Sequence, residues 1–188
     1  MKKHTAFILA AVMLISLCAC GKSEGTSDTA DVDKNLLTVT ITIPESYAAK
    51  VTQEELDNSV AKGRSMSATK NDDGSITYVM TRSQHKALLD MISQTIDGQL
   101  DRMPESEDYP DITKVEHSAD YTQFTVTTRN EEVSISETVS ILAFYMYGNM
   151  YGAYSGESPD NVSVSFVNEA SGEVIDEANS ADIEAQGN

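Results

Sequence analysis

Apolar residues in this chain follow distinct spacings, and each spacing predicts a different kind of element. From 36 to 43 they alternate with threonines and stop at Pro44, which is typical of a half-buried strand. From 83 to 103 they recur every three or four positions, which predicts an amphipathic helix that carries Leu88, Leu89, Ile92, Ile96, Leu100 and Met103 on one face. Pairs of segments separated by turn residues predict further strands at 64–70, 75–81, 112–117, 121–129, 162–166 and 173–176.

Local signals add a turn and two more helices. Asn71-Asp72-Asp73-Gly74 predicts a plain turn, because it lacks the alternating carboxylates and the final glutamate of a calcium loop. Thr52 and Glu55 form a capping box, which predicts a short helix with Leu56 and Val60 inward and Gly63 just past its end. A third helix is predicted over 133–154.

The order of these elements predicts an α+β fold, in which an antiparallel sheet built from hairpins carries about three packed helices. This domain is expected over 35–178. The polar and acidic residues 179–188 are expected to form a disordered tail.

The third predicted helix is the least ordinary segment of the chain. Phe144, Tyr147, Tyr151 and Tyr154 share one side, and Leu142, Met146, Met150 and Ala153 share a second. Gly148 and Gly152 lie on a third side, where two interior glycines indicate close packing against another backbone. The tyrosine side is either the core face of a buried central helix or a candidate interaction face for a partner or an apolar ligand.

The chain begins with Lys2, Lys3 and an apolar run over 6–17, which has the layout of a secretory signal peptide and is too short to span a membrane. The run closes on Leu17-Cys18-Ala19-Cys20-Gly21, which resembles the lipobox of bacterial lipoproteins. Cys18 is the one departure from that pattern. An ordinary secreted protein and an uncleaved N-terminal anchor are the alternatives.

The resemblance implies a role for each residue of this motif. Leu17 takes the aliphatic position, Ala19 the small position before the cut and Cys20 the lipid acceptor, followed by Gly21. Residues 1–19 are then a cleaved signal peptide, and 20–34 are a lipidated cysteine and flexible linker. The protein is expected on the extracytoplasmic face of the cell membrane, and it resembles small acidic lipoproteins of Gram-positive anaerobes to which no activity is assigned.

Charge narrows the choice of partners. The chain has 13 Lys and Arg residues against 30 Asp and Glu residues, for a formal net charge of −17. Removal of residues 1–19, which hold two lysines and no acid, leaves 11 basic residues and a net charge of −19. Nucleic acid is excluded as a partner, because its binding needs cationic side chains at the phosphates. The membrane is expected to be contacted only through the lipid.

Candidate catalytic chemistry is sparse. Beyond the signal peptide only His85 and His117 remain, and the chain has no HExxH, CxxC or GxSxG motif. We therefore assign no catalytic residue, no metal ligand and no cofactor from the sequence. Carboxylates are plentiful, but in so acidic a chain pairs of them arise by chance and do not indicate a catalytic site.

These observations favour a membrane-anchored lipoprotein that is not an enzyme and whose domain binds an unknown protein or small ligand. One alternative is a carboxylate-based or divalent-ion-dependent hydrolase of envelope material. A second is a homo-oligomeric envelope scaffold packed through the Gly148 and Gly152 helix.

Overall fold

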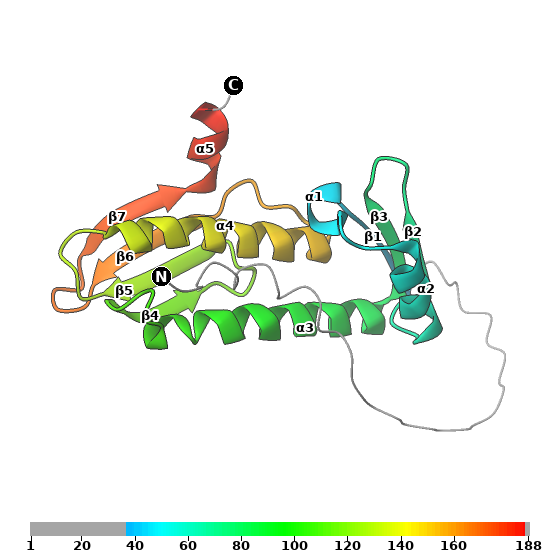
Figure 1. The fold of residues 1–188 in the computed structure, drawn as a ribbon, viewed down its shortest axis with the longest axis horizontal. Coiled ribbons are helices and arrows are strands. Elements are labelled where there is room, and N and C mark those ends of the chain that lie inside the picture. Colours follow the sequence, from blue (N-terminus) through cyan, green and yellow to red (C-terminus); the bar gives the residue numbers. More distant parts are fainter. Residues whose placement is uncertain (1–36, 187–188) are drawn as a thin grey trace, which may run out of the picture. The chain divides into compact units, whose positions relative to one another are not determined.

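The computed structural model describes residues 37–186, of which 184–186 are described by their backbone alone (Figure 1). These residues form two sheets with three longer helices packed on them, which confirms the predicted α+β class. The predicted signal peptide, the lipobox residues Leu17, Ala19, Cys20 and Gly21, and the linker lie outside the described residues.

The first sheet has three antiparallel strands in the order β1-β3-β2, namely β1 (Thr38–Ile43), β3 (Ile76–Thr81) and β2 (Ser67–Lys70). The predicted turn between β2 and β3 is confirmed. The amide of Gly74 donates to the carbonyl of Asn71 at 3.0 Å, and Asp73 Oδ1 accepts from the amide of Ser75 at 3.0 Å. The Asp73 carboxylate therefore holds the turn itself.

Two short helices, α1 (Glu45–Ala48) and α2 (Gln53–Ala61), pack against this sheet. The predicted capping box is present, with Thr52 and Glu55 bonded to each other's backbone amides, and Gly63 follows the helix with a φ of 69°. Leu56 is buried. It joins a smaller core that comprises Ile41, Ile43, Ala48, Leu56, Ala68, Ile76 and Met80.

The second sheet has four strands in the order β4-β5-β6-β7, namely β4 (Ile112–His117), β5 (Gln123–Thr128), β6 (Ser163–Asn168) and β7 (Val174–Asn179). The two outer pairs are antiparallel hairpins, as predicted. The central pair is parallel, with Val126 opposite Phe166. The structure thus differs from the single antiparallel sheet expected from the sequence. The helix α4 (Ile135–Ser155) carries the chain back along the sheet, so β6 starts at the same end as β5.

The long helix α3 (Arg82–Leu100) connects the two sheets. The apolar face of α3 is the predicted one, and it contacts both cores. Leu88 packs against the smaller core, while Ile96 and Leu100 are buried in the larger one. The helix ends at Leu100, and Pro104 lies in the 3₁₀ helix η2 (Met103–Glu105) that follows.

The larger core lies between the second sheet and helices α3 and α4. Its buried members are Ile96, Leu100, Met103, Ile112, Tyr121, Phe124, Val126, Phe144, Tyr145, Val162, Val164 and Phe166. Helix α4 also reaches β1 of the first sheet, where Tyr154 packs against the smaller core.

The structure differs from the predicted disordered tail at the C-terminal end, where residues Ser180–Gln186 form helix α5. The Ser180 amide donates to the carbonyl of Val162 at 2.9 Å, and the Val162 amide donates to Ser180 Oγ at 2.8 Å. Asn161 Oδ1 accepts from the amide of Ala181 at 3.1 Å. These bonds attach the start of α5 to a segment almost twenty residues earlier, which no local pattern reveals.

Candidate functional site

Helix α4 is fixed at both ends by side-chain and backbone caps. At its start Ser134 Oγ accepts from the amide of Glu137 at 3.3 Å, and Glu137 Oε2 accepts from the amide of Ser134 at 2.7 Å. Glu137 is 1% exposed and also accepts from Asn130 Nδ2 at 3.1 Å. At the other end Gly156 has a φ of 88° and its amide donates to the carbonyl of Gly152. The helix therefore presents fixed faces over its whole length.

The buried carboxyl of Glu137 is held in its charged form. Burial alone would raise its pKa, but hydrogen bonds from Thr128, Ser134 and Asn130 outweigh burial and lower the pKa below the ordinary value of a glutamate. A negative charge at this position also interacts favourably with the N-terminal end of the helix.

The tyrosine side of α4, which the sequence offered as a candidate interaction face, is directed into the protein. Phe144 is 0% exposed, and its ring centroid lies 4.9 Å from that of Phe124. Tyr147 and Tyr151 pack against the larger core, and Tyr154 packs against the smaller one. The structure therefore corrects the interaction-face interpretation. These rings fill the space between α4, α3 and the sheets.

Gly148 and Gly152 are buried against the same chain. A Cβ atom built at Gly148 would lie 2.5 Å from the carbonyl oxygen of Tyr121 and 2.6 Å from Cγ2 of Val162. At Gly152 it would meet the ring of Pro159, and it would lie 2.8 Å from the carbonyl oxygen of Glu157. The close neighbours are intramolecular, so this side of the helix is not available to a second copy.

The side of α4 that faces away from the core carries four large apolar residues in one line, which we call the outer seam. The exposed fractions are 85% for Ile135, 59% for Val139, 62% for Leu142 and 41% for Met146. Sequence reasoning placed Leu142 and Met146 on one side together with Met150 and Ala153, which the structure packs inward, and it missed Ile135 and Val139. The signal that identifies all four is their spacing of four, three and four residues.

The seam residues are uncharged, and acidic residues lie just before the helix that carries them. Between Thr138 and Gly156 the chain has no Asp, Glu, Lys or Arg. Glu131 and Glu132, both exposed, come just before the helix, and no basic residue follows Arg129. Within residues 37–186 no helix combines the length and apolar character that crossing a membrane requires. The outer seam is thus an uncharged apolar line on an acidic half of the chain.

A second cluster of polar groups lies where the β4–β5 turn meets α3. The Tyr121 hydroxyl donates to Asp97 Oδ1 at 2.6 Å, and His117 Nε2 lies 3.2 Å from the same oxygen. The His117 and Tyr121 rings are stacked with centroids 4.4 Å apart. Burial and the hydrogen bond to Asp97 raise the pKa of the Tyr121 phenol to about 12, so the phenol remains a hydrogen-bond donor well above neutral pH.

This cluster accounts for an unusual backbone conformation. Tyr121 has a φ of 57°, a left-handed value that non-glycine residues rarely adopt. The conformation directs the phenol to α3 and the carbonyl oxygen to Gly148. His85, the other histidine among the described residues, bonds through Nε2 to the carbonyl of Tyr154 at 2.8 Å. His117 therefore connects the end of β4 to α3, and His85 connects α3 to the end of α4.

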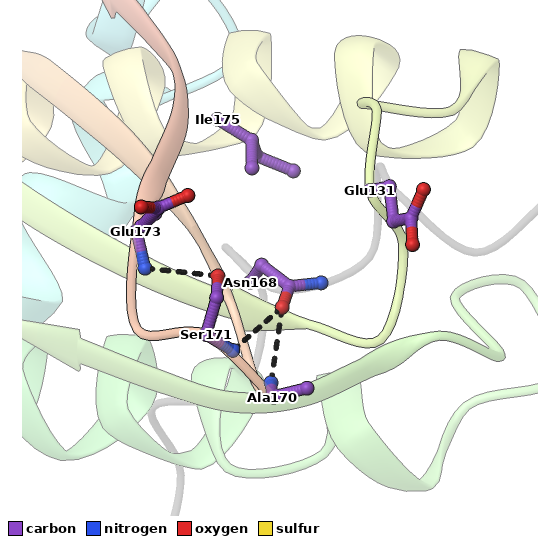
Figure 2. A pocket seen from close by; sticks show the side chains of 6 residues that line it. All are labelled: Glu131, Asn168, Ala170, Ser171, Glu173 and Ile175. Carbon is purple, nitrogen blue, oxygen red and sulfur yellow. Dashed lines mark hydrogen bonds between the residues drawn. The ribbon is translucent and has the colours of Figure 1, made fainter.

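Figure 2 shows an open depression between the β5–α4 loop, which supplies Glu131, and the β6–β7 turn. Asn168 Oδ1 accepts from the amides of Ala170 and Ser171 at 3.0 and 2.9 Å. Ser171 Oγ accepts from the amide of Glu173 at 3.2 Å. These polar groups build the turn. In the part of the chain that the structure describes, no group of three His, Cys, Asp or Glu side chains is arranged to hold a metal ion.

Comparison with protein-family models, with curated proteins and with solved structures finds no match for this chain.

The contact at Gly148 predicts opposite effects for two glycine-to-alanine changes. Gly148→Ala should lower the free energy of unfolding by about 2 kcal/mol, because its Cβ would overlap the Tyr121 carbonyl oxygen. Gly98→Ala in α3, where a Cβ meets nothing within 4 Å, should raise it by up to about 1 kcal/mol. Urea unfolding of both variants measures the difference, and a neutral Gly148→Ala would contradict the close approach.

The cap at Glu137 predicts a pH-dependent stability. Because its pKa is lowered in the folded state, its contribution is fully present above the ordinary glutamate pKa and is lost as the pH falls through the lowered value. Glu137→Gln should lower the free energy of unfolding at pH 7 and flatten its dependence below about pH 4. Urea unfolding at several pH values tests this. Glu132→Gln, at an exposed position before the helix, is the matched control and should change stability at pH 7 by less than about 0.5 kcal/mol.

Proposed function

We propose that this chain is a lipid-anchored extracytoplasmic protein whose α+β domain is a non-enzymatic interaction module, with the outer seam of α4 as its contact surface. The observation that carries the proposal is the line of exposed apolar residues Ile135, Val139, Leu142 and Met146. Single exposed apolar residues are normal on a protein surface, but a contiguous apolar patch is typical of an interaction site.

The fold does not require apolar residues at these positions. The opposite side of α4 supplies Phe144 and the glycine contacts that place the helix, while the seam residues lie outside both cores. The centre of a protein interface is depleted in charge and enriched in large apolar residues such as Met. The seam has this composition, and its acidic neighbours Glu131 and Glu132 would lie at the rim.

The anchoring part of the proposal depends on the N-terminal sequence. Cys20 would carry the lipid, and residues 20–34, which are mainly Gly, Ser, Thr, Asp and Ala, would act as a tether with a root-mean-square reach of about 20 Å. Such a tether keeps the domain close to the membrane surface, while the acidic domain is repelled by anionic lipid headgroups. The seam would then be presented to other proteins of the envelope.

The two cysteines near the N-terminus allow a matched test of anchoring. Cys20→Ala should move the protein from the membrane fraction to the medium or leave it as an uncleaved precursor, because the lipid acceptor is lost. Cys18→Ala, which keeps the acceptor and restores the more usual lipobox residue, should stay in the membrane fraction. Globomycin, which blocks the lipoprotein signal peptidase, should cause the precursor of the wild-type protein to accumulate. Unchanged fractionation of Cys20→Ala would contradict anchoring at this residue.

Occupancy of the seam can be measured by cysteine labelling on intact cells, because the only cysteine of the expected mature chain is Cys20. A maleimide that does not cross membranes should react about tenfold more slowly with Leu142→Cys on cells than with the same variant in a dilute, purified, unlipidated chain whose Cys20 is replaced by Ala. A tenfold slowing corresponds to about nine-tenths occupancy. Ser171→Cys, at an exposed position in the β6–β7 turn, is the control and should react equally in both settings. Equal labelling at 142 would contradict a contact role for the seam.

A further inference from the structure

We propose that one end of the first sheet, which we call the basic end, binds the anionic lipid headgroups of the membrane to which the chain is anchored. This inference rests on the anchoring part of the proposed function. It adds the folded domain to a membrane contact that was expected from the sequence to involve the lipid alone. The basic end comprises six exposed residues, namely Leu37, Lys62, Arg64, Met66, Arg82 and Lys86.

The pairing of the strands brings the first of these residues together. Where β1 begins and β3 ends, the Arg82 amide donates to the carbonyl of Leu37 at 3.1 Å. On the other side of β3, just before β2, the Met66 amide donates to the carbonyl of Val79 at 2.8 Å. Leu37, Arg82 and Met66 therefore lie at the same end of three adjacent strands.

The helices on either side add further cations at this end. Gln84 Nε2 donates to the carbonyl of Gly63 at 2.7 Å, which joins the end of α2 to the first turn of α3. The neighbours of Gly63 in the chain are Lys62 and Arg64. Lys86 lies about one turn after the first residue of α3, on the same side of the helix. Four cationic side chains are thus gathered around one junction of strands and helices.

Acidic residues are absent from the segments that build the basic end. Residues 37–44, 58–71 and 74–89 contain no Asp or Glu. The acids between the last two segments, Asp72 and Asp73, belong to the β2–β3 turn, which lies at the opposite end of the strands from the start of α3 (Figure 1). Positive and negative charge are therefore separated along the strands of the first sheet.

The cations are accessible to lipid phosphates. Within residues 37–186, Lys62 and Arg82 take part in none of the ion pairs. Lys86 pairs with Asp90 at 2.6 Å, but its side chain is 74% exposed. Phosphate oxygens accept strong hydrogen bonds from ammonium and guanidinium groups, so these side chains can bind headgroups without breaking a buried contact.

The apolar residues beside the cations favour a lipid surface over a dissolved anion. Leu37 is 50% exposed and Met66 is 49% exposed. Proteins that bind at the surface of a bilayer combine cations for the headgroups with apolar side chains that enter the boundary with the acyl chains. A dissolved anion would contact the cations alone, whereas a lipid surface contacts both kinds of residue.

The position of the basic end in the chain points to the anchoring membrane as its partner. Leu37 is the first described residue, so the segment that leads back to Cys20 joins the domain here. Of all parts of the domain, the basic end is therefore closest along the chain to the proposed lipid. A short tether raises the effective concentration of the surface that it links, so even a weak contact forms.

The net negative charge orients the domain and does not prevent the contact. Residues 104–186 contain only Lys114 and Arg129 as cations, and they follow α3, which has 19 residues and is about 28 Å long. Charges in physiological salt are screened over about 8 Å. The basic end is therefore attracted to an anionic surface and the distant acidic part is repelled, so the domain turns its basic end to the membrane.

A tryptophan reporter tests this orientation, because the chain contains no tryptophan. A chain that begins at Cys20 is coupled through that cysteine to a maleimide lipid, which supplies the anchor chemically. Lipids with a nitroxide headgroup should quench Met66→Trp at least about twofold more on vesicles with phosphatidylglycerol than on phosphatidylcholine alone. Val174→Trp, at a position that is 54% exposed on β7, is the control and should be quenched equally on both.

Charge reversal at the basic end tests which residues are responsible. Each cation at an anionic surface contributes about a fivefold preference, so Lys62→Glu/Arg82→Glu should remove the difference in quenching of Met66→Trp. Lys50→Glu/Arg102→Glu makes the same change in net charge at exposed positions outside the basic end and should keep the difference. Thermal unfolding of both double variants should match the parent. Loss of the difference in both would assign it to net charge and overturn the proposal.

Salt and phosphate distinguish a lipid surface from a discrete anion site. Raising the salt concentration from about 0.1 M to about 1 M shortens the screening length from about 10 Å to about 3 Å and should remove the difference. A difference that survives high salt would contradict an electrostatic contact. Inorganic phosphate at constant ionic strength should have no effect, because the cations contact several headgroups at once. Suppression by phosphate would indicate a discrete phosphate site and overturn the headgroup assignment.

The outcome separates this inference from the proposed function. Equal quenching of Met66→Trp on both kinds of vesicle would overturn the inference and leave the anchoring proposal intact, because the coupling to lipid is chemical. If quenching is as expected but Cys20→Ala does not change fractionation in cells, the headgroup contact stands and anchoring at Cys20 fails.

Discussion

Gly148 lets the backbone of α4 lie against the carbonyl oxygen of Tyr121 and the side chain of Val162, and the arrangement of the larger core depends on this approach. Without a side chain at 148 the helix comes close enough for Phe144 to meet Phe124 and for Tyr151 to meet Tyr121. The left-handed backbone of Tyr121 belongs to the same contact, because it directs the phenol to Asp97 on α3 while the carbonyl faces α4. Two helices and the β4–β5 turn are thus held by one close packing point.

The rotation of α4 follows from the same contact and divides the helix into sides with different roles. The aromatic side is covered by packing, because Phe144 and Tyr147 contact the larger core and Tyr154 contacts the smaller one. The glycine side is covered too, because Gly148 lies against Tyr121 and Val162. Ile135, Val139, Leu142 and Met146 are left exposed. An uncharged apolar line therefore faces solvent in a chain that is otherwise strongly acidic.

Much of the fold could be predicted because strand alternation and helix capping depend only on residues that are close together in the sequence. Alternating threonines gave β1, and the capping box at Thr52 located α2. The same box recurs at Thr81 with Gln84 and at Ser134 with Glu137, and it would have located the starts of α3 and α4 to the residue. Pairing between distant strands is not a local property. The parallel alignment of β5 with β6 and the attachment of α5 to Val162 therefore could not be predicted.

The sequence by itself determined that residues 133–154 form a helix with an aromatic side, a glycine side and a further apolar side, because a period of 3.6 residues fixes which residues share a side. It also determined the acidic charge and the lipobox-like N-terminus. Only the tertiary structure decided which side of the helix is buried, because burial depends on what Tyr121, Val162 and α3 place against it. The tyrosines that looked like a contact surface pack against the two cores, and the side that the cores leave uncovered is the outer seam.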